Sequence, residues 1–237
     1  RKFRSEPIAP EVLQDMLEAA SRASTCGNMQ LYSLIVTQSR ELREALAPCH
    51  FNQPMVTQAP CVITVCADVH RFSMWCEQRD AEPCYDNFAW FLNGVTDALL
   101  AAQNLCVEAE AHGLGICYLG TTIYTAEEIA RILDLPKGVI PVTTIVVGHP
   151  DESPELTDRL PLDAVVHCEK YHHYTSSEID ELWAEKETSE ETRRLLEENG
   201  LPNLAQIFTR NRYRAEDNLA ISRNYFALLK KQGFFNN

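Results

Sequence analysis

The six-residue run Cys61–Cys66 (CVITVC) decides the fold class, because all but one of its residues are apolar and four are β-branched. Such a run is typical of a strand that is covered on both faces of its sheet. Working outward, Leu31–Thr37 and Val139–Gly148 have the same character, and Ile116–Leu119 predicts a shorter strand. Helical patterns separate these segments, so the sequence predicts an α/β layout.

The helices are predicted from apolar residues at helical spacing. The strongest is Phe88–His112, which is rich in alanine, is apolar around much of its circumference and is followed by Gly113 as a C-cap residue. Weaker patterns predict a helix that starts at Pro10, a short one at Glu41–Ala47 and an amphipathic one at Ala126–Leu133.

The character of the chain changes after Pro150, where a polar, proline-containing segment begins. Val165–His167 predicts a short edge strand, Thr175–Asn199 a strongly acidic helical run, and Arg210–Phe235 a basic-leaning helix. Without a flexible linker or a repeat, we expect one folded core over residues 1–171. Residues 172–237 are expected to form a C-terminal helical extension, packed on the same domain or on a dimer partner.

Charge and cysteine usage exclude several classes of function. The 237 residues carry 21 Lys and Arg against 34 Asp and Glu, a net charge of −13, which disfavours nucleic acids and anionic membranes as partners. No apolar run approaches the roughly 20 residues that span a bilayer. Nine cysteines without a CxxC pair favour a reducing compartment, so we expect a cytoplasmic protein.

Motifs for several kinds of chemistry are missing. The sequence has no phosphate-binding GxxxxGK[ST] loop, no GxGxxG after a strand, and neither GxSxG nor HExxH. His167, Cys168, His172 and His173 cluster without a second pair of ligands, so no metal site is expected.

Five polar segments remain, and their order along the chain is informative. They are RKFRSEPI at Arg1–Ile8, ASTCGNMQ at Ala23–Gln30, FNQPMV at Phe51–Val56, GLGICYLG at Gly113–Gly120 and RLPLDAVVHCEKY at Arg159–Tyr171. In this order and spacing the chain resembles the FMN-dependent nitroreductase superfamily. The nearest branch is that of the NADPH nitroreductases and flavin reductases, and the similarity resumes at Ser222–Phe234.

The resemblance implies a three-layer α/β homodimer with a mostly antiparallel sheet between helices, and with FMN bound non-covalently at the dimer interface. Phe88–His112 would then be an interface helix; the alternative is the core helix of a monomer. The implied function is NAD(P)H-dependent, two-electron reduction of nitroaromatics, quinones or flavins by ping-pong turnover.

The resemblance also implies site residues. Arg1 would face the N1–C2=O edge of FMN, where a fixed cation stabilises the reduced ring. Thr25 and Gln53 would hydrogen-bond the cofactor, and the backbone N–H of Gly120 or Thr121 would face N5. Tyr118 and Leu119 would line the ring, and Arg159 would bind the phosphate. No catalytic side chain is expected, because flavin N5 carries the hydride.

Two arginines are expected to bind NADPH or the substrate. Arg223 matches such a position, and Arg212 belongs to a basic loop suited to a 2′-phosphate. Two departures from the family pattern are Thr157, where lysine is common, and Thr121, where glycine is common.

The alternatives to this function are a specialised flavin-destructase-like or dehalogenase-like enzyme, a non-catalytic FMN-binding protein, and an interaction module that uses the acidic Glu178–Glu198 segment.

Overall fold

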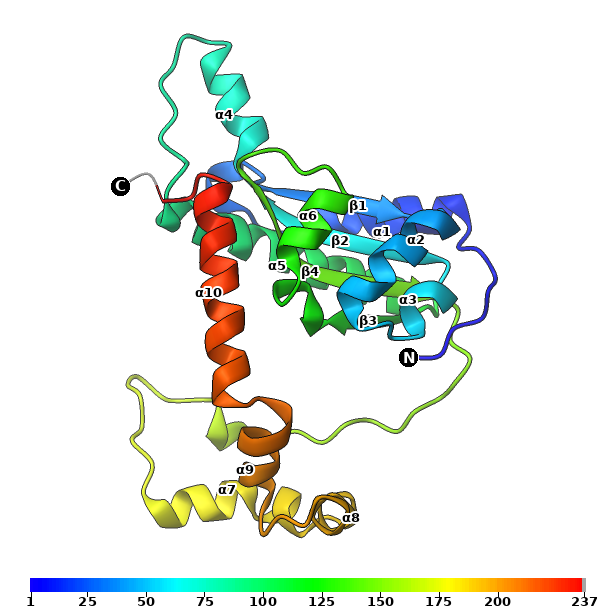
Figure 1. Ribbon diagram of the computed structural model, residues 1–237, viewed down its shortest axis with the longest axis vertical. Coiled ribbons are helices and arrows are strands. Elements are labelled where there is room, and N and C mark those ends of the chain that lie inside the picture. The colour runs from blue at the N-terminus through cyan, green and yellow to red at the C-terminus, as the bar shows by residue number, and fades with distance from the viewer. Residues whose placement is uncertain (236–237) are drawn as a thin grey trace. The chain divides into compact units, whose positions relative to one another are not determined.

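A computed structural model describes residues 1–235, and in it a four-stranded antiparallel sheet forms the centre of the part that holds residues 1–153 (Figure 1). The strands are β1 (Tyr32–Thr37), β2 (Cys61–Asp68), β3 (Gly115–Leu119) and β4 (Val139–Gly148), in the spatial order β1-β2-β4-β3. Ile63 pairs with Val36 on one side and with Ile145 on the other. All eight residues of β2 are buried, as expected for a central strand with both faces covered.

Helices cover both faces of this sheet. On one face lie α1 (Pro10–Ser21) and α5 (Phe88–Ala111), and on the other lie α2 (Arg40–Leu46), α3 (Met55–Gln58) and α6 (Ala126–Ile132) (Figure 1). Alternate strand residues point to opposite faces, which gives each face its own core. The arrangement confirms the predicted α/β fold with its antiparallel sheet between helical layers.

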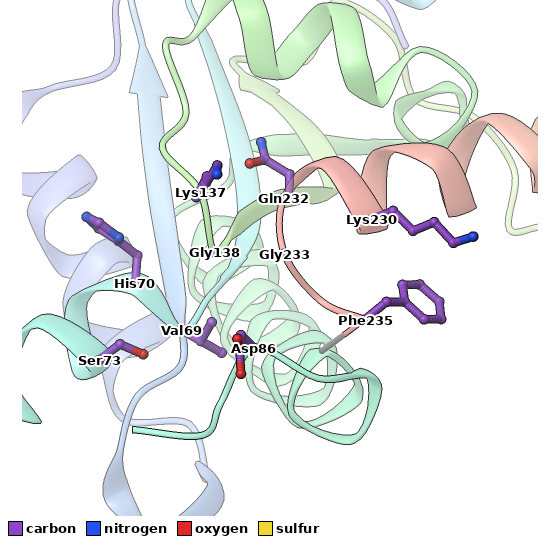
Figure 2. Close-up of a pocket in the computed structure, with 10 residues that line it drawn as sticks. All are labelled: Val69, His70, Ser73, Asp86, Lys137, Gly138, Lys230, Gln232, Gly233 and Phe235. Carbon is purple, nitrogen blue, oxygen red and sulfur yellow. The ribbon is translucent and has the colours of Figure 1, made fainter. Parts of the chain in front are cut away.

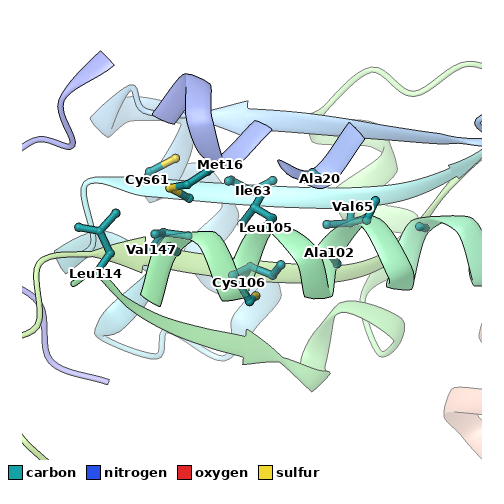
Figure 3. Packing of buried hydrophobic residues seen from close by; sticks show 14 of the residues in the cluster. Met16, Ala20, Cys61, Ile63, Val65, Ala102, Leu105, Cys106, Leu114 and Val147 are labelled. Carbon is teal, nitrogen blue, oxygen red and sulfur yellow. The ribbon is translucent and has the colours of Figure 1, made fainter. Parts of the chain in front are cut away.

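The larger core lies between the sheet and the pair α1 and α5. Met16 from α1 and Leu105 from α5 meet Ile63, Val65 and Val147 from the sheet there, and all five are fully buried (Figure 3). The opposite face packs Val62 and Val146 against residues of the α2–α3 region. Fully burying side chains of this size contributes roughly 1.5–3 kcal/mol each, so this core dominates the stability of the sheet.

The chain folds into two compact units. The first holds residues 1–153 and 221–237, and the second holds residues 154–220. Residue 171, where the sequence suggested a boundary, thus falls inside the second unit, and the last segment of the chain returns to the first. Helix α4 (His70–Glu77), which no pattern predicted, belongs to the first unit.

The second unit is helical. It contains α7 (Ser176–Thr188), α8 (Glu190–Asn199), α9 (Leu204–Ile207), the π-helical turn η5 (Phe208–Arg212) and the first residues of α10 (Ala215–Lys231). The predicted acidic run is two helices, because Ser189 adopts an extended conformation and caps α8 by accepting from the Thr192 N–H. The predicted basic helix is likewise interrupted between η5 and α10.

The edge strand expected at Val165–His167 is wrong. Leu162–Ala164 forms a short 3-10 turn, and the N–H groups of Val165 and Val166 both donate to the Leu162 carbonyl. These donors are therefore used within the turn and cannot join a sheet ladder. Both valines are exposed, and no strand pairs with them among the described residues.

Among residues 1–235, no helix combines the length and the apolar character that crossing a membrane requires.

Candidate functional site

The chain leaves β3 at Leu119 and turns at once into the 3-10 segment η3 (Gly120–Ile123). Leu119 is buried in the core on the α2–α3 side of the sheet, which anchors the start of the turn. The Thr122 hydroxyl donates to the Leu119 carbonyl at 2.8 Å and lies 3.0 Å from the Thr144 hydroxyl on β4. Gly120 is exposed, and a Cβ added there would meet no atom within 4 Å. The turn therefore presents open backbone beside a fixed strand end.

A second loop, residues 47–53, carries Gln53. It begins with the 3-10 turn η2 (Ala47–His50) and continues through Phe51 and Asn52, which both have left-handed backbone with φ of 55° and 54°. The loop is closed by two internal bonds, from Asn52 N–H to the Ala47 carbonyl and from Gln53 N–H to the His50 carbonyl. Half-buried Gln53 thus stands just before α3 on a tightly folded loop.

Side-chain contacts join these two loops. His50 Nδ1 lies 2.8 Å from the Thr121 hydroxyl, and the Thr125 hydroxyl donates to the Cys49 carbonyl at 2.7 Å. The rings of Phe51 and Tyr124 lie 6.1 Å apart between centroids. The structure thus brings predicted residues Gln53, Gly120 and Thr121 into one neighbourhood.

His50 and Tyr118 are both kept neutral in this region. Burial lowers the pKa of His50 to about 4, so the imidazole carries no charge at neutral pH. Desolvation, followed by a hydrogen bond with the Cys106 thiol, raises the pKa of Tyr118. Its phenol therefore stays protonated while the ring remains partly exposed on β3.

The segment that carries Arg1 is fixed beside the end of β4. Phe3 pairs with Pro150, and the Arg4 N–H donates to the His149 carbonyl at 2.9 Å. The N–H of Lys2 donates to Glu152 at 3.1 Å. The Arg1 side chain itself is exposed.

Thr25 lies elsewhere, in the loop between α1 and β1. The neighbouring Cys26 N–H donates to the buried carboxylate of Asp97 on α5, which holds this loop against the helix. No hydrogen bond among residues 1–235 links Thr25 to the loops around Gln53 and Gly120. Thr25 thus lies on a loop held against α5, whereas Gly120 follows Leu119, which is buried on the α2–α3 side of the sheet, so the two are separate within one chain.

The second unit contains two further predicted residues, Arg159 and Arg212, and they line the same cavity of about 490 Å³. The Arg159 guanidinium donates to the Thr157 hydroxyl at 2.6 Å and to the Asp158 carbonyl at 2.8 Å. Arg212 lies over the Phe208 ring, 5.5 Å from its centroid. Arg223 belongs instead to the part of α10 that falls in the first unit, where it is exposed.

A cavity of about 500 Å³ in the first unit contains none of the predicted residues. It lies where α4 begins, beside Gly138 and the end of α10 (Figure 2). The side chains of His70, Lys137 and Lys230 point in different directions there, so the three do not converge on one ligand position.

Two buried residues of functional interest, Asp97 and His50, were missed by the sequence analysis. An acidic residue inside the apolar pattern of Phe88–His112 is a signal for Asp97, because a buried carboxylate needs hydrogen-bond donors. His50 offers no such signal, because a histidine beside a turn is ordinarily exposed.

Comparison with known proteins identifies the family. The nitroreductase family matches this chain over residues 1–90 and 46–149. An NADPH-dependent oxidoreductase of Staphylococcus aureus strain USA300 is 35% identical over 176 residues, which are 73% of this chain and 70% of the relative.

Two solved structures have the same fold as this chain over its whole length. A crystal structure described as that of an oxidoreductase from Bacteroides fragilis NCTC 9343 has a TM-score of 0.98 and 49% identity, covering 100% of this chain and 96% of the other. The NADPH:FMN oxidoreductase of Vibrio harveyi, solved with NAD⁺, has a TM-score of 0.82 and 26% identity, covering 100% and 94%. The motif order and the fold therefore both led to the right family, and the chain belongs to the nitroreductase family of oxidoreductases.

Proposed function

We propose that this protein is an FMN-dependent NADPH oxidoreductase that reduces nitroaromatics, quinones or flavins in two-electron steps by ping-pong turnover. The observation that carries the proposal is the junction of the Gln53 loop, through the contact between His50 and Thr121, with the open backbone at Gly120. The Staphylococcus aureus relative is named as NADPH-dependent, and the Vibrio harveyi neighbour is named as an NADPH:FMN oxidoreductase. Both names agree with the proposed reaction.

The residues present fit FMN. At Gly120 no atom lies within 4 Å of where a Cβ would stand, so a planar ring can approach the backbone there. Gln53 supplies a side-chain amide from the adjoining loop, and an amide both donates and accepts hydrogen bonds. When bound, FMN supplies a ring that accepts and releases hydride at N5.

The chain's own residues would bind and orient that ring. The N–H of Gly120 or Thr121 would donate to the ring edge, and the chain at Tyr118 and Leu119, where β3 ends, would line the ring. Arg1 would add a positive charge at the opposite edge, where a preorganised cation favours the reduced state. Thr25 would complete the hydrogen bonds to the cofactor.

Arg159 is the proposed phosphate ligand. Its guanidinium already donates to the Thr157 hydroxyl, and this contact restricts the side chain. Thr157 adds no charge, so Arg159 supplies the fixed cation of this loop. An arginine so restrained binds a phosphate with less loss of side-chain entropy than a free one.

Arg212 and Arg223 are the proposed contacts for NADPH or the acceptor. Arg212 lies over the Phe208 ring, and a guanidinium placed over a ring can still donate its N–H groups to a phosphate. A 2′-phosphate bound there would favour NADPH over NADH.

The proposed assembly is a homodimer formed through α5. Its exposed side includes Phe88, Leu92, Leu99, Leu100 and Val107. At about 100° per residue these five side chains fall within roughly a third of the helix circumference. An apolar stripe of this kind, on the helix face away from the core, is typical of an interaction surface. A cofactor shared between two protomers would also account for the separation of Thr25 from Gly120 within one chain.

All nine cysteines are free thiols, in agreement with the proposed location in the reducing cytoplasm.

The experiment is a visible absorption spectrum of the purified protein, before and after FMN is added, followed by anaerobic NADPH. We expect flavin bands that bleach with NADPH and return when a quinone or nitroaromatic is added. Bands that persist with both NADPH and NADH would indicate a non-catalytic FMN-binding protein. Absence of flavin binding even with excess FMN would overturn the proposal. Turnover restricted to another acceptor class would favour a specialised enzyme on the same scaffold.

A further inference from the structure

His50 is the most completely buried titratable side chain near the proposed flavin site. Its ring has no exposed surface, and its Nδ1 lies 2.8 Å from the Thr121 hydroxyl. The other ring nitrogen, Nε2, has no partner among the described residues. Leaving a buried polar atom unpaired has a cost in stability, so a histidine here calls for a reason beyond packing.

The contact joins two loops that are 71 positions apart in the sequence. Two further contacts accompany it: the Thr125 hydroxyl donates to the Cys49 carbonyl, and the rings of Phe51 and Tyr124 lie 6.1 Å apart between centroids. A connection through three neighbouring points fixes orientation as well as distance. The two loops are therefore held to each other by two hydrogen bonds and one ring contact.

The backbone next to His50 is strained. Phe51 and Asn52 are consecutive non-glycine residues with left-handed φ, and a bulky aromatic residue rarely adopts this conformation. Strain of this kind persists only where surrounding contacts fix it, and it concentrates at functional sites. The pair directly follows His50, which makes the buried bond to Thr121.

We propose that His50 is a positioning residue: through Thr121 it fixes the backbone N–H groups of Gly120 and Thr121 relative to Gln53, so that both loops hold the edge of the flavin ring together. His50 itself touches no ligand in this assignment. The inference rests on the proposed function, because it assigns the joined loops to FMN.

Four single variants test the contact in matched pairs. Thr121→Val removes the hydroxyl at nearly constant volume, whereas Thr121→Ser keeps it. His50→Gln extends its amide toward the Nε2 position and loses the bond, whereas His50→Asn keeps an amide atom near the Nδ1 position. Asparagine can donate or accept, so the second pair does not depend on the tautomer of His50.

Two readouts separate a positioning role from a merely structural one. The first is amide hydrogen exchange of residues 120–125 in flavin-free protein, which reports on local opening. The second is the Kd for FMN together with the midpoint potential of the bound flavin. For Thr121→Val and His50→Gln we expect exchange to be about tenfold faster, FMN to bind about three- to tenfold more weakly, and the potential to shift. Those factors correspond to the loss of one hydrogen bond.

Thr121→Ser and His50→Asn should restore the exchange rates, the Kd and the potential to within about twofold of wild type. Urea unfolding of all four variants identifies any that fail to fold. If a variant at one of the two residues fails to fold, the matched pair at the other residue tests the proposal. If Thr121→Val binds FMN as wild type does with an unchanged potential, the positioning role is overturned while the proposed function stands. If wild-type protein binds no FMN, the proposed function fails, and the positioning role fails with it.

Discussion

The carboxylate of Asp97 on α5 accepts a hydrogen bond from the backbone N–H of Leu31 at 3.0 Å, directly before β1 begins. Its second oxygen accepts from the Cys26 N–H at 2.9 Å. One buried side chain therefore ties the middle of the loop that carries Thr25, and the end of that loop before β1, to the long helix. Gly94, one turn earlier on α5, permits this approach: a Cβ there would lie 3.2 Å from the Leu31 carbonyl oxygen.

Replacing Asp97 should destabilise the protein and loosen this loop. In Asp97→Asn one backbone N–H would face the amide NH2 group, so a buried donor loses its acceptor. We expect a loss of about 1–3 kcal/mol in the free energy of unfolding, measured by urea denaturation of flavin-free protein. The control is Glu110→Gln on the exposed side of the same helix, which should change stability by less than about 0.5 kcal/mol. Equal effects of the two variants would contradict the role of Asp97.

The sheet and most of its helices could be predicted because local patterns determine them. Cys61–Cys66 and Val139–Gly148 are apolar enough to require burial on both faces, and α5 has few polar positions. The edge strand at Val165–His167 failed for a physical reason. Apolar β-branched residues favour a strand, yet a strand forms only where a partner edge is available, and the preceding turn uses these N–H donors.

Gly148 should not tolerate a side chain. A Cβ at this position would lie 2.5 Å from Cδ of Pro60 and 3.2 Å from Cδ1 of Phe3. Because the proline ring is tied to its own backbone, it cannot rotate away. We expect Gly148→Ala to lower the free energy of unfolding by about 1–3 kcal/mol in urea denaturation.

Gly120→Ala is the matched variant, since its added methyl group would meet no atom within 4 Å. Its stability should stay within about 0.5 kcal/mol of wild type. On the proposed function the same methyl group obstructs the flavin ring, so the Kd for FMN should rise at least about tenfold, a change of roughly 1.4 kcal/mol. Unchanged FMN affinity in this variant would argue against flavin contact at Gly120.

The stability of the flavin-free protein should depend on pH through His50. Its pKa is about 4 in the folded protein and 6.5 for an unperturbed histidine, so the unfolded chain binds the proton more readily. The free energy of unfolding therefore falls as the pH decreases from about 6.5 to about 4. Above pH 6.5 the imidazole is neutral in both states, and His50 causes no loss of stability there. The full loss is about 3 kcal/mol.

The check is urea denaturation at several pH values between about 4 and 7, compared with His50→Asn, which cannot titrate. The variant should show a shallower dependence across that window even if its overall stability is lower. Parallel curves for the two proteins would mean that folding does not lower the pKa of His50.

The candidate site was less predictable than the sheet. Motif order identified Gln53, Gly120 and Thr121, which the folded chain brings together. The contact that joins their loops was not predictable, because His50 and Thr121 lie far apart in the sequence. The residues around each of them do not indicate that the other is its hydrogen-bond partner. Hydrogen bonds between loops depend on the final packing of the sheet beneath them.

The apolar stripe on α5 gives a test of assembly. Leu99 is 43% exposed at the middle of the stripe, so a charged residue there costs the isolated chain little. In a dimer through α5 the same charge would be buried without a partner, which is strongly unfavourable. We expect wild-type protein to have twice the chain mass in size-exclusion chromatography with light scattering, and Leu99→Glu to have the mass of one chain.

Leu162→Glu is the control, because Leu162 is more exposed than Leu99 but belongs to the second unit and lies outside the stripe. It should leave the mass unchanged. The dimer hypothesis also predicts that Leu99→Glu loses FMN binding together with dimerisation, since Thr25 and Gly120 of one chain are separate. A variant of single-chain mass that still binds FMN with wild-type affinity would mean that one protomer contains the complete cofactor site.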